Sequence, residues 1–128
     1  MKKIRNSIII DLYQYDFYQN NIHNNDNINI NILKHIIKNI DLIDLIIKKN
    51  LYNYEINRLN KVDKAIIRLA TFELLNKKNS HKIIINEAIE LTKKYSDLNN
   101  SKQYKFNNKI LHLIFEDVEK NKYKINEL

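Results

Sequence analysis

The sequence predicts an all-α fold, and three observations support this prediction. Apolar residues recur at intervals of three and four along almost the whole chain, which is the spacing of one face of an α-helix. Glycine and proline, which many turns of strand-rich folds require, are both absent. Polar, Asn-rich segments separate the apolar ones, and Asn tolerates positive φ better than other non-glycine residues. The 128 residues fit a single domain, residues 1–128.

The first helix is expected over about residues 2–18, followed by an Asn-rich, low-complexity connection over residues 19–31. Four residues of this helix form one apolar stripe: Ile4, Ile8, Leu12 and Tyr15. Four others lie away from the centre of that stripe: Lys2, Lys3, Arg5 and Tyr13. This spacing predicts a helix with one buried face and one basic, exposed face.

The second and third helices are expected over about residues 32–39 and 41–49. Asp41 is placed to cap the third helix. The inner face of the third helix is expected to consist of Leu42, Leu45 and Ile46. Residues 51–54 are interpreted as a bridge between two sub-bundles, formed by about residues 1–52 and 53–128.

The fourth helix has the clearest signals. Asn60 is the expected N-cap, and Asp63 stands at the third helical position of a capping-box pattern. Apolar residues then continue to about residue 75 on more than one side, so we expect this helix to be central. Lys77 and Lys78 follow its end, where cations favour the helix dipole.

A fifth helix is expected over about residues 84–95 and a sixth over about residues 102–120. The expected inner residues of these two helices are Ile85, Ala88, Ile89, Thr92, Phe106, Ile110, Leu113 and Ile114. The tail from Asn121 onward is expected to be frayed.

Most enzyme classes lack the residues they need. The chain has no Cys for thiolate sites and no Gly for a phosphate-cradling loop, and its four His residues show no metal-ligand spacing. Glu87 with Glu90, and Glu116 with Glu119, lie one turn apart, but such pairs are far more often solvated surface than metal or proton sites. We therefore expect no enzymatic activity, no catalytic residue, no metal and no cofactor.

The formal net charge of +7 allows two interpretations. Excess cations favour contact with polyanions, because each phosphate contact releases counterions. Ile, Asn and Lys, however, make up about half of the chain, so drift in an A/T-biased genome is an equally good explanation of the charge. No apolar run is long enough to span a bilayer and no signal peptide is recognisable, so we expect a cytosolic protein with no membrane partner.

Two groups of residues are candidates for nucleic-acid binding. Lys2, Lys3 and Arg5 lie near Tyr13 and Gln14, which combines cations for phosphates with a ring that can stack on an unpaired base. A solvated basic N-terminus with Tyr13 packed in the core is the alternative.

The second group lies near the start of the last helix. Phe106 stands between Lys105 and Lys109, and core packing is the commoner role for a residue of this kind. Both roles remain open for Phe106, as they do for Tyr13.

Four segments of the chain resemble the NusB family. The central segment, residues 58–75, reads RLNKVDKAIIRLATFELL, and the next, residues 85–95, reads INEAIELTKKY. Residues 105–111, KFNNKIL, resemble the start of the last helix of the family, and residues 12–16, LYQYD, match its first helix. The segments occur in family order and spacing and span nearly the whole chain.

The resemblance implies a NusB-like fold of two small helical sub-bundles with about six to seven helices. It also implies a transcription antitermination factor that pairs with the ribosomal protein NusE and binds single-stranded boxA RNA for a transcription elongation complex. The RNA-binding residues that the resemblance and the sequence pattern together favour are Lys2, Lys3, Arg5, Tyr13, Gln14, Arg68, Lys105 and Phe106. The expected NusE surface surrounds Asp63 and Glu73.

Some positions depart from the family pattern. Lys109 stands where the family has a Gly, and the segment 96–104 is longer than usual. Lys2 and Lys3 replace part of an Arg-rich N-terminus, and Lys lacks the planar fork that grips phosphate. A rival interpretation is therefore a helical scaffold that binds only proteins, with its RNA binding eroded. The NusB-like module of ribosomal RNA methyltransferases is disfavoured, because the chain has no room for a catalytic domain.

Overall fold

The computed structural model describes residues 2–17, 30–52, 55–96 and 102–127. These residues form six α-helices and one short 3-10 helix, and this part of the chain contains no strand. The elements are α1 (Lys2–Phe17), α2 (Ile30–Lys38), α3 (Ile40–Asn50), η1 (Ile56–Arg58), α4 (Lys61–Asn76), α5 (His81–Tyr95) and α6 (Lys102–Asn121). The predicted all-α fold is confirmed.

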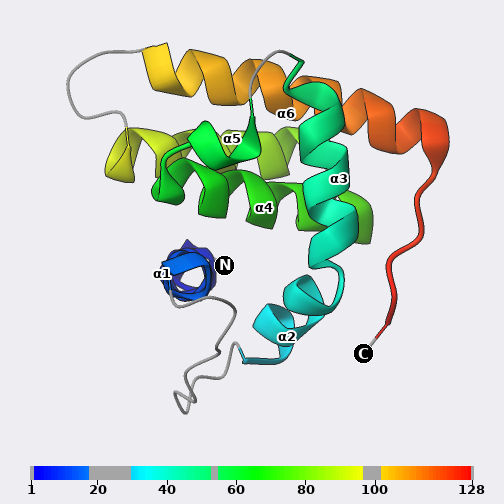
Figure 1. Cartoon of the computed structure of the whole chain (residues 1–128), viewed down its shortest axis with the longest axis horizontal. Coiled ribbons are helices and arrows are strands. Elements are labelled where there is room, and N and C mark those ends of the chain that lie inside the picture. The colour runs from blue at the N-terminus through cyan, green and yellow to red at the C-terminus, as the bar shows by residue number, and fades with distance from the viewer. Residues whose placement is uncertain (1, 18–29, 53–54, 97–101, 128) are drawn as a thin grey trace.

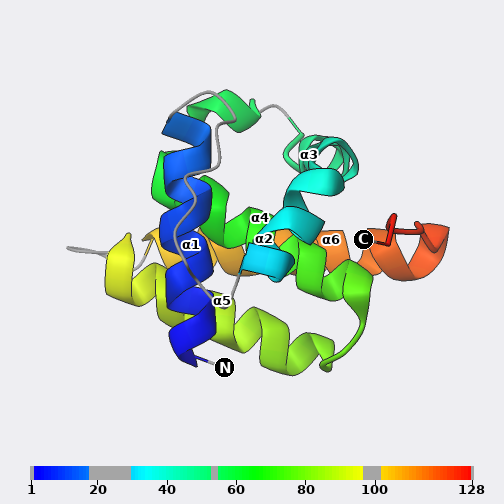
Figure 2. The same ribbon diagram turned by 90° about the horizontal axis from the view of Figure 1, so that it is seen from below.

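Helix α4 is the centre of the molecule. It packs against α1, α3, α5 and α6, and all of its residues from Asp63 to Phe72 are buried. Helices α4, α5 and α6 run side by side in alternating directions, so the start of α4, the end of α5 and the start of α6 share one end of the bundle (Figure 1). Helix α1 crosses over α4 on the opposite side from α6 (Figure 2). The expected central position of this helix is confirmed.

Side-chain caps fix where α4 and α5 begin. Asn60 Oδ1 accepts a hydrogen bond of 2.8 Å from the Asp63 backbone N–H, as the capping pattern predicts. Lys77 ends α4 in the left-handed region at φ 59°, although it is not glycine. Helix α5 begins at His81 rather than near residue 84, because Ser80 caps it by accepting from the Ile83 N–H at 3.4 Å.

Helix α3 differs from expectation in its cap and its inner face. Asn39, not Asp41, is the N-cap, and its side chain makes no cap hydrogen bond to the α3 backbone. Leu45 is 52% exposed, so its assignment to the inner face was wrong. The buried residues are Ile43, Ile46 and Ile47. Helix α3 packs against both α4 and α6, so contacts that the sequence does not reveal decide which of its apolar residues are buried.

The segment after α6 is packed rather than frayed. Asn126 exchanges two hydrogen bonds with the buried Asn39: its N–H donates to Asn39 Oδ1 at 2.7 Å and its carbonyl accepts from Asn39 Nδ2 at 2.9 Å. Tyr123 donates to Asp117 Oδ1 at 3.0 Å, and Ile125 packs against the core. The prediction of a frayed tail failed because the paired backbone groups lie far apart in sequence, where no local pattern reveals them.

Several predictions fall outside the described residues: nearly all of the 19–31 connection, the end of the 51–54 bridge, and residues 97–101 of the long loop. The side chains of Lys2 and Lys3 are also outside the described part. Among the described helices, none is long and apolar enough to cross a membrane.

Candidate nucleic-acid interface

Two partly exposed aromatic residues, Tyr13 and Phe106, belong to α1 and α6, two helices that pack against α4. Tyr13 is 38% exposed on α1, and one turn further along that helix Asp16 contacts Lys61 and Lys64 of α4. Phe106 is half-buried near the start of α6 and lines a pocket with Asn60, the α4 N-cap. Neither ring is sealed in the interior, which is the condition for either ring to reach a base.

The pocket beside Phe106 has a volume of about 390 Å³. Its lining consists of Arg58, Leu59, Asn60, Asp63, Lys102, Gln103 and Phe106. Arg58 and Lys102 are exposed cations at its edge, and Lys105 is exposed on the next turn of α6. A ring, amide groups and cations around one hollow are the components that hold an unpaired base and its phosphate.

Sequence reasoning missed Arg58, Lys102 and Gln103 as members of this group. The signal for the last two was present, because residues three and four positions before Phe106 share its helix face. Arg58 stands in η1, and only the tertiary fold brings it to the same pocket as the residues of α6.

Asp63, which lines that pocket, is almost fully buried. Its side chain is 1% exposed, and its carboxylate accepts from Asn60 Nδ2 at 2.6 Å and from Asn107 Nδ2 at 3.1 Å. Asn107 also donates to Thr92 Oγ1 at 3.0 Å and accepts from Gln103 Nε2 at 3.1 Å. This buried network joins α4, α5 and α6 and fixes the turn of α6 that carries Phe106. The Asp63 carboxylate is therefore held by this network, and its predicted contact with a partner stays a prediction.

Arg68 is also turned inward. It is 5% exposed, and its guanidinium donates to both oxygens of Asp44 at 2.9 and 2.7 Å and to Asp16 at 3.3 Å. Burial works against the charged form, but the bonds and charges of Asp44 and Asp16 outweigh burial and raise the Arg68 pKa. Arg68 therefore joins α4 to α1 and α3, and the predicted phosphate contact would compete with two carboxylates.

Asp16 accepts bonds from three cations of α4. Lys61 lies at 2.8 Å, Lys64 at 2.9 Å and Arg68 at 3.3 Å. Burial alone would raise the Asp16 pKa, but the hydrogen bonds from Lys61 and Lys64 and the nearby positive charges lower it from 3.8 to about 2. The carboxylate is thus ionised at all ordinary pH values and offsets part of the charge of α4.

Arg5 and Glu73 form a second inward pair. The Arg5 guanidinium is 4% exposed and donates to Glu73 through Nε at 3.1 Å and through Nη2 at 2.8 Å. The prediction that Arg5 lies outside the buried stripe of α1 was wrong, because a carboxylate on α4 allows the charge to be buried. Glu73 is 14% exposed. Of the remaining predicted residues, Lys105 is exposed and Gln14 is half-buried.

Among the described residues, no group of three or more His, Asp or Glu side chains is arranged to hold a metal ion.

Comparisons with known proteins match residues 16–116 to the NusB family. The transcription antitermination protein NusB of Buchnera aphidicola subsp. Cinara cedri is 39% identical over 120 residues, which cover 92% of this chain and 80% of that protein. The protein of the same name from Clostridium kluyveri is 47% identical over 68 residues. That match covers 52% of this chain and 44% of the Clostridium protein, so it spans less than half of that relative.

Solved structures share the fold at lower identity. NusB of T. maritima is 28% identical with a TM-score of 0.75, over 91% of this chain and 90% of that one. NusB from Aquifex aeolicus, solved in solution, is 26% identical with a TM-score of 0.77, over 98% and 93%. A chain in the crystal structure of a plectonemic RNA supercoil is 26% identical with a TM-score of 0.79, over 94% and 96%.

Proposed function

Because the chain belongs to the NusB family, we propose that it is a transcription antitermination factor that binds single-stranded, boxA-type RNA together with the ribosomal protein NusE. It would act as an RNA-binding component of a transcription elongation complex, without catalysing a reaction. The observation that carries this proposal is the partial exposure of Tyr13 and Phe106 on two helices that pack against α4, beside exposed cations.

The two aromatic residues would contribute most of the base contact. Phe106 forms one wall of the pocket that Arg58 and Lys102 border, so a base stacked on this ring would place its phosphate near both cations. Stacking on an aromatic side chain contributes roughly 1–3 kcal/mol per base. Tyr13, on α1, would stack on a second base.

The cations divide into those that would contact RNA and those that support the scaffold. Lys105, with Arg58 and Lys102, lies on the surface and would contact phosphates. Arg5 and Arg68 are held by Glu73, Asp44 and Asp16, and would act on RNA mainly by fixing α1, the helix that carries Tyr13, against α4. Lys2 and Lys3 remain predicted phosphate contacts.

A titration of boxA-like RNA against scrambled RNA, each with and without NusE, tests the proposal. We expect tighter binding to boxA-like RNA in the presence of NusE, and Phe106→Ala should weaken that binding about tenfold. Phe115→Leu is the matched control, because Phe115 stacks on His81 further along α6 and should leave RNA affinity unchanged. Equal affinity for the two RNAs in the presence of NusE would reject RNA recognition.

A helical scaffold that binds only proteins is the second candidate, and the inward pairing of Arg5 and Arg68 favours it. On this interpretation NusE binds normally, but added RNA does not tighten the complex. The same titration separates the two functions, because a scaffold would show NusE binding together with equally weak affinity for both RNAs.

A further inference from the structure

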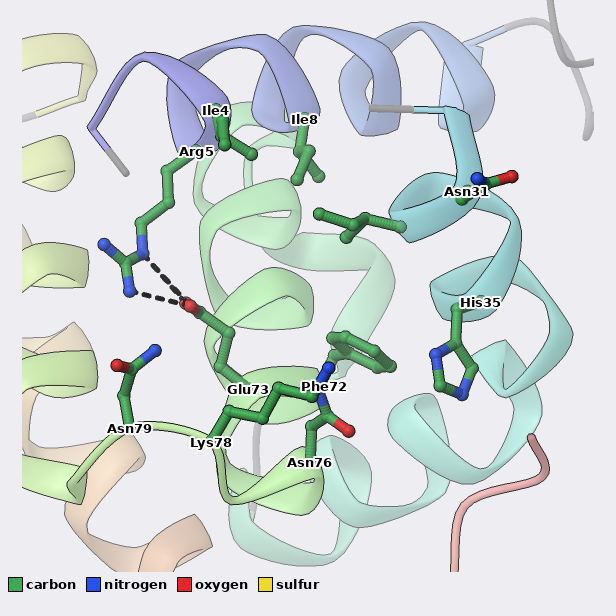
Figure 3. A pocket seen from close by; sticks show the side chains of 11 residues that line it. Ile4, Arg5, Ile8, Asn31, His35, Phe72, Glu73, Asn76, Lys78 and Asn79 are labelled. Carbon is green, nitrogen blue, oxygen red and sulfur yellow. Dashed lines mark hydrogen bonds and ion pairs between the residues drawn. The ribbon is translucent and has the colours of Figure 1, made fainter. Parts of the chain in front are cut away.

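A pocket that the RNA proposal does not use lies at the other end of α4. It has a volume of about 230 Å³ and lies between the start of α1, α2 and the end of α4 (Figure 3). Its lining comes from three helices and from the segment between α4 and α5, so the tertiary fold alone assembles it.

The floor and one wall of this pocket are apolar. Ile4 and Ile8 of α1, Ile32 of α2 and Phe72 of α4 line it. The His35 ring meets the edge of Phe72 with ring centroids 5.0 Å apart and completes the wall. Apolar cavities of about 150 Å³ can hold a benzene-sized molecule, so one aromatic side chain fits here.

A hydrogen bond to the segment after α6 holds the His35 ring, one wall of the pocket, in place. His35 Nε2 lies 3.0 Å from the Asn126 carbonyl, and because a carbonyl only accepts, this nitrogen must be the donor. Asn39 Nδ2 donates to the same carbonyl at 2.9 Å. The segment after α6 thus fixes the ring before any ligand arrives, which reduces the entropy lost on binding.

The rim of the pocket is polar and carries an excess positive charge. The charge of Arg5 is offset by Glu73 at 2.8 Å. Lys78 is exposed and forms no ion pair with a carboxylate of the described residues. Figure 3 shows its side chain running along the pocket edge toward Phe72, above Asn76. A negatively charged group beside the pocket mouth would complement Lys78.

We propose that this pocket docks a short acidic segment of a partner protein, which inserts one aromatic side chain against Phe72 and places a neighbouring carboxylate on Lys78. The apolar floor selects the ring, and the cation selects its acidic neighbour. The site does not depend on the RNA proposal, because Phe106 and its pocket lie at the opposite end of α4.

NMR titration of the full-length protein with acetylated, amidated peptides tests this proposal. The probe is Ser-Asp-Phe-Asp-Ser, and the two comparison peptides replace both Asp by Lys or the Phe by Ala. We expect saturable shifts centred on Ile4, Ile8 and Phe72 with the probe only. No saturation, shifts centred elsewhere, or equal binding of the Lys peptide would each overturn the proposal.

Two variants and one matched control make the test specific. Lys78→Glu should weaken binding of the acidic probe roughly fivefold and tighten binding of the Lys peptide. Lys82→Glu, an exposed charge reversal on α5, is the matched control and should leave both affinities unchanged. Ile4→Phe should fill the pocket and abolish binding, and its circular dichroism spectrum will show whether it is folded. Undiminished binding by folded Ile4→Phe or by Lys78→Glu would place the ligand elsewhere.

Discussion

Two cations of α4 and two of α6 carry the same formal charge but have opposite environments. In α4, Lys64 and Arg68 are buried and bound to carboxylates of α1 and α3. In α6, Lys105 and Lys109 are exposed. A charge that is removed from water must be paired, whereas an exposed charge stays available to solvent and ligands.

This difference shows why net charge alone does not locate a binding surface. Arg5 and Arg68 look like phosphate ligands in sequence, yet Glu73, Asp16 and Asp44 offset them locally. On the proposed function, the positive charge that meets RNA comes from exposed residues such as Lys105.

Removing Arg68, a buried cation of α4, should destabilise the protein strongly. Arg68→Met leaves Asp44 and Asp16 without their partner, and we expect a loss of about 3–5 kcal/mol in the free energy of unfolding. Urea denaturation measures this loss. Lys105→Met is the matched control and should change stability by less than about 0.5 kcal/mol. A small loss in Arg68→Met combined with lost RNA binding would make Arg68 a ligand-facing residue.

Breaking the network behind Phe106 should have the next largest effect. Asn107→Ala removes the donor to Asp63 and Thr92, and leaving a buried carboxylate less satisfied costs about 1–3 kcal/mol. If the network also positions Phe106, RNA affinity should fall even where the variant remains folded. Asn108→Ala, exposed on the same turn, should change neither property. Unchanged RNA affinity in folded Asn107→Ala would contradict the positioning role.

Acid should weaken the link between α1 and α4. The Asp16 pKa is lowered to about 2, so its stabilising contribution is complete above its ordinary value of 3.8 and is lost as pH falls toward 2. Because the carboxylate keeps some solvent contact, we expect a loss of about 1 kcal/mol over this window. Denaturation at pH 5, 4, 3 and 2 measures it. The Asp16→Asn variant should be less stable than the parent protein at pH 5, and its free energy of unfolding should change less over the same pH window. An equally steep pH dependence in this variant would assign the loss of stability to other groups.

The smallest effects concern the exposed cations. If Lys105 contacts a phosphate, Lys105→Gln should reduce the steepness of log affinity against log salt by about 0.7 for single-stranded RNA. Lys120→Gln, near the other end of α6, should not change the slope. Anisotropy titrations at several salt concentrations provide the slopes. If Lys120→Gln changes the salt slope as much as Lys105→Gln does, the RNA contacts α6 at no defined position.

Lys109 offers a finer comparison, because it is an exposed cation three residues after Phe106 on α6. The variant Lys109→Gly separates two effects that the long cation could have. A gain in RNA affinity would indicate that Lys109 blocks the RNA. A shallower slope of log affinity against log salt would indicate that Lys109 contacts a phosphate. An unchanged affinity and slope would exclude both effects.

The sequence by itself determined the helices, the central role of α4 and the family. These features are local: the apolar period, the Asn60 cap and the order of family segments can all be recognised without knowing which helices touch. The two candidate rings, Tyr13 and Phe106, were also identified from sequence, because aromatic residues beside cations form a local pattern.

Only the tertiary structure decided which charges face inward. Arg5 and Glu73 are separated by 68 residues, and Arg68 and Asp44 by 24, so no local pattern could pair them. The same holds for Asn39 with Asn126 across 87 residues, and for the pocket at the end of α4. Periodicity tells which face of a helix is apolar, but a charged residue at the edge of that face is buried only when another helix supplies its counter-charge.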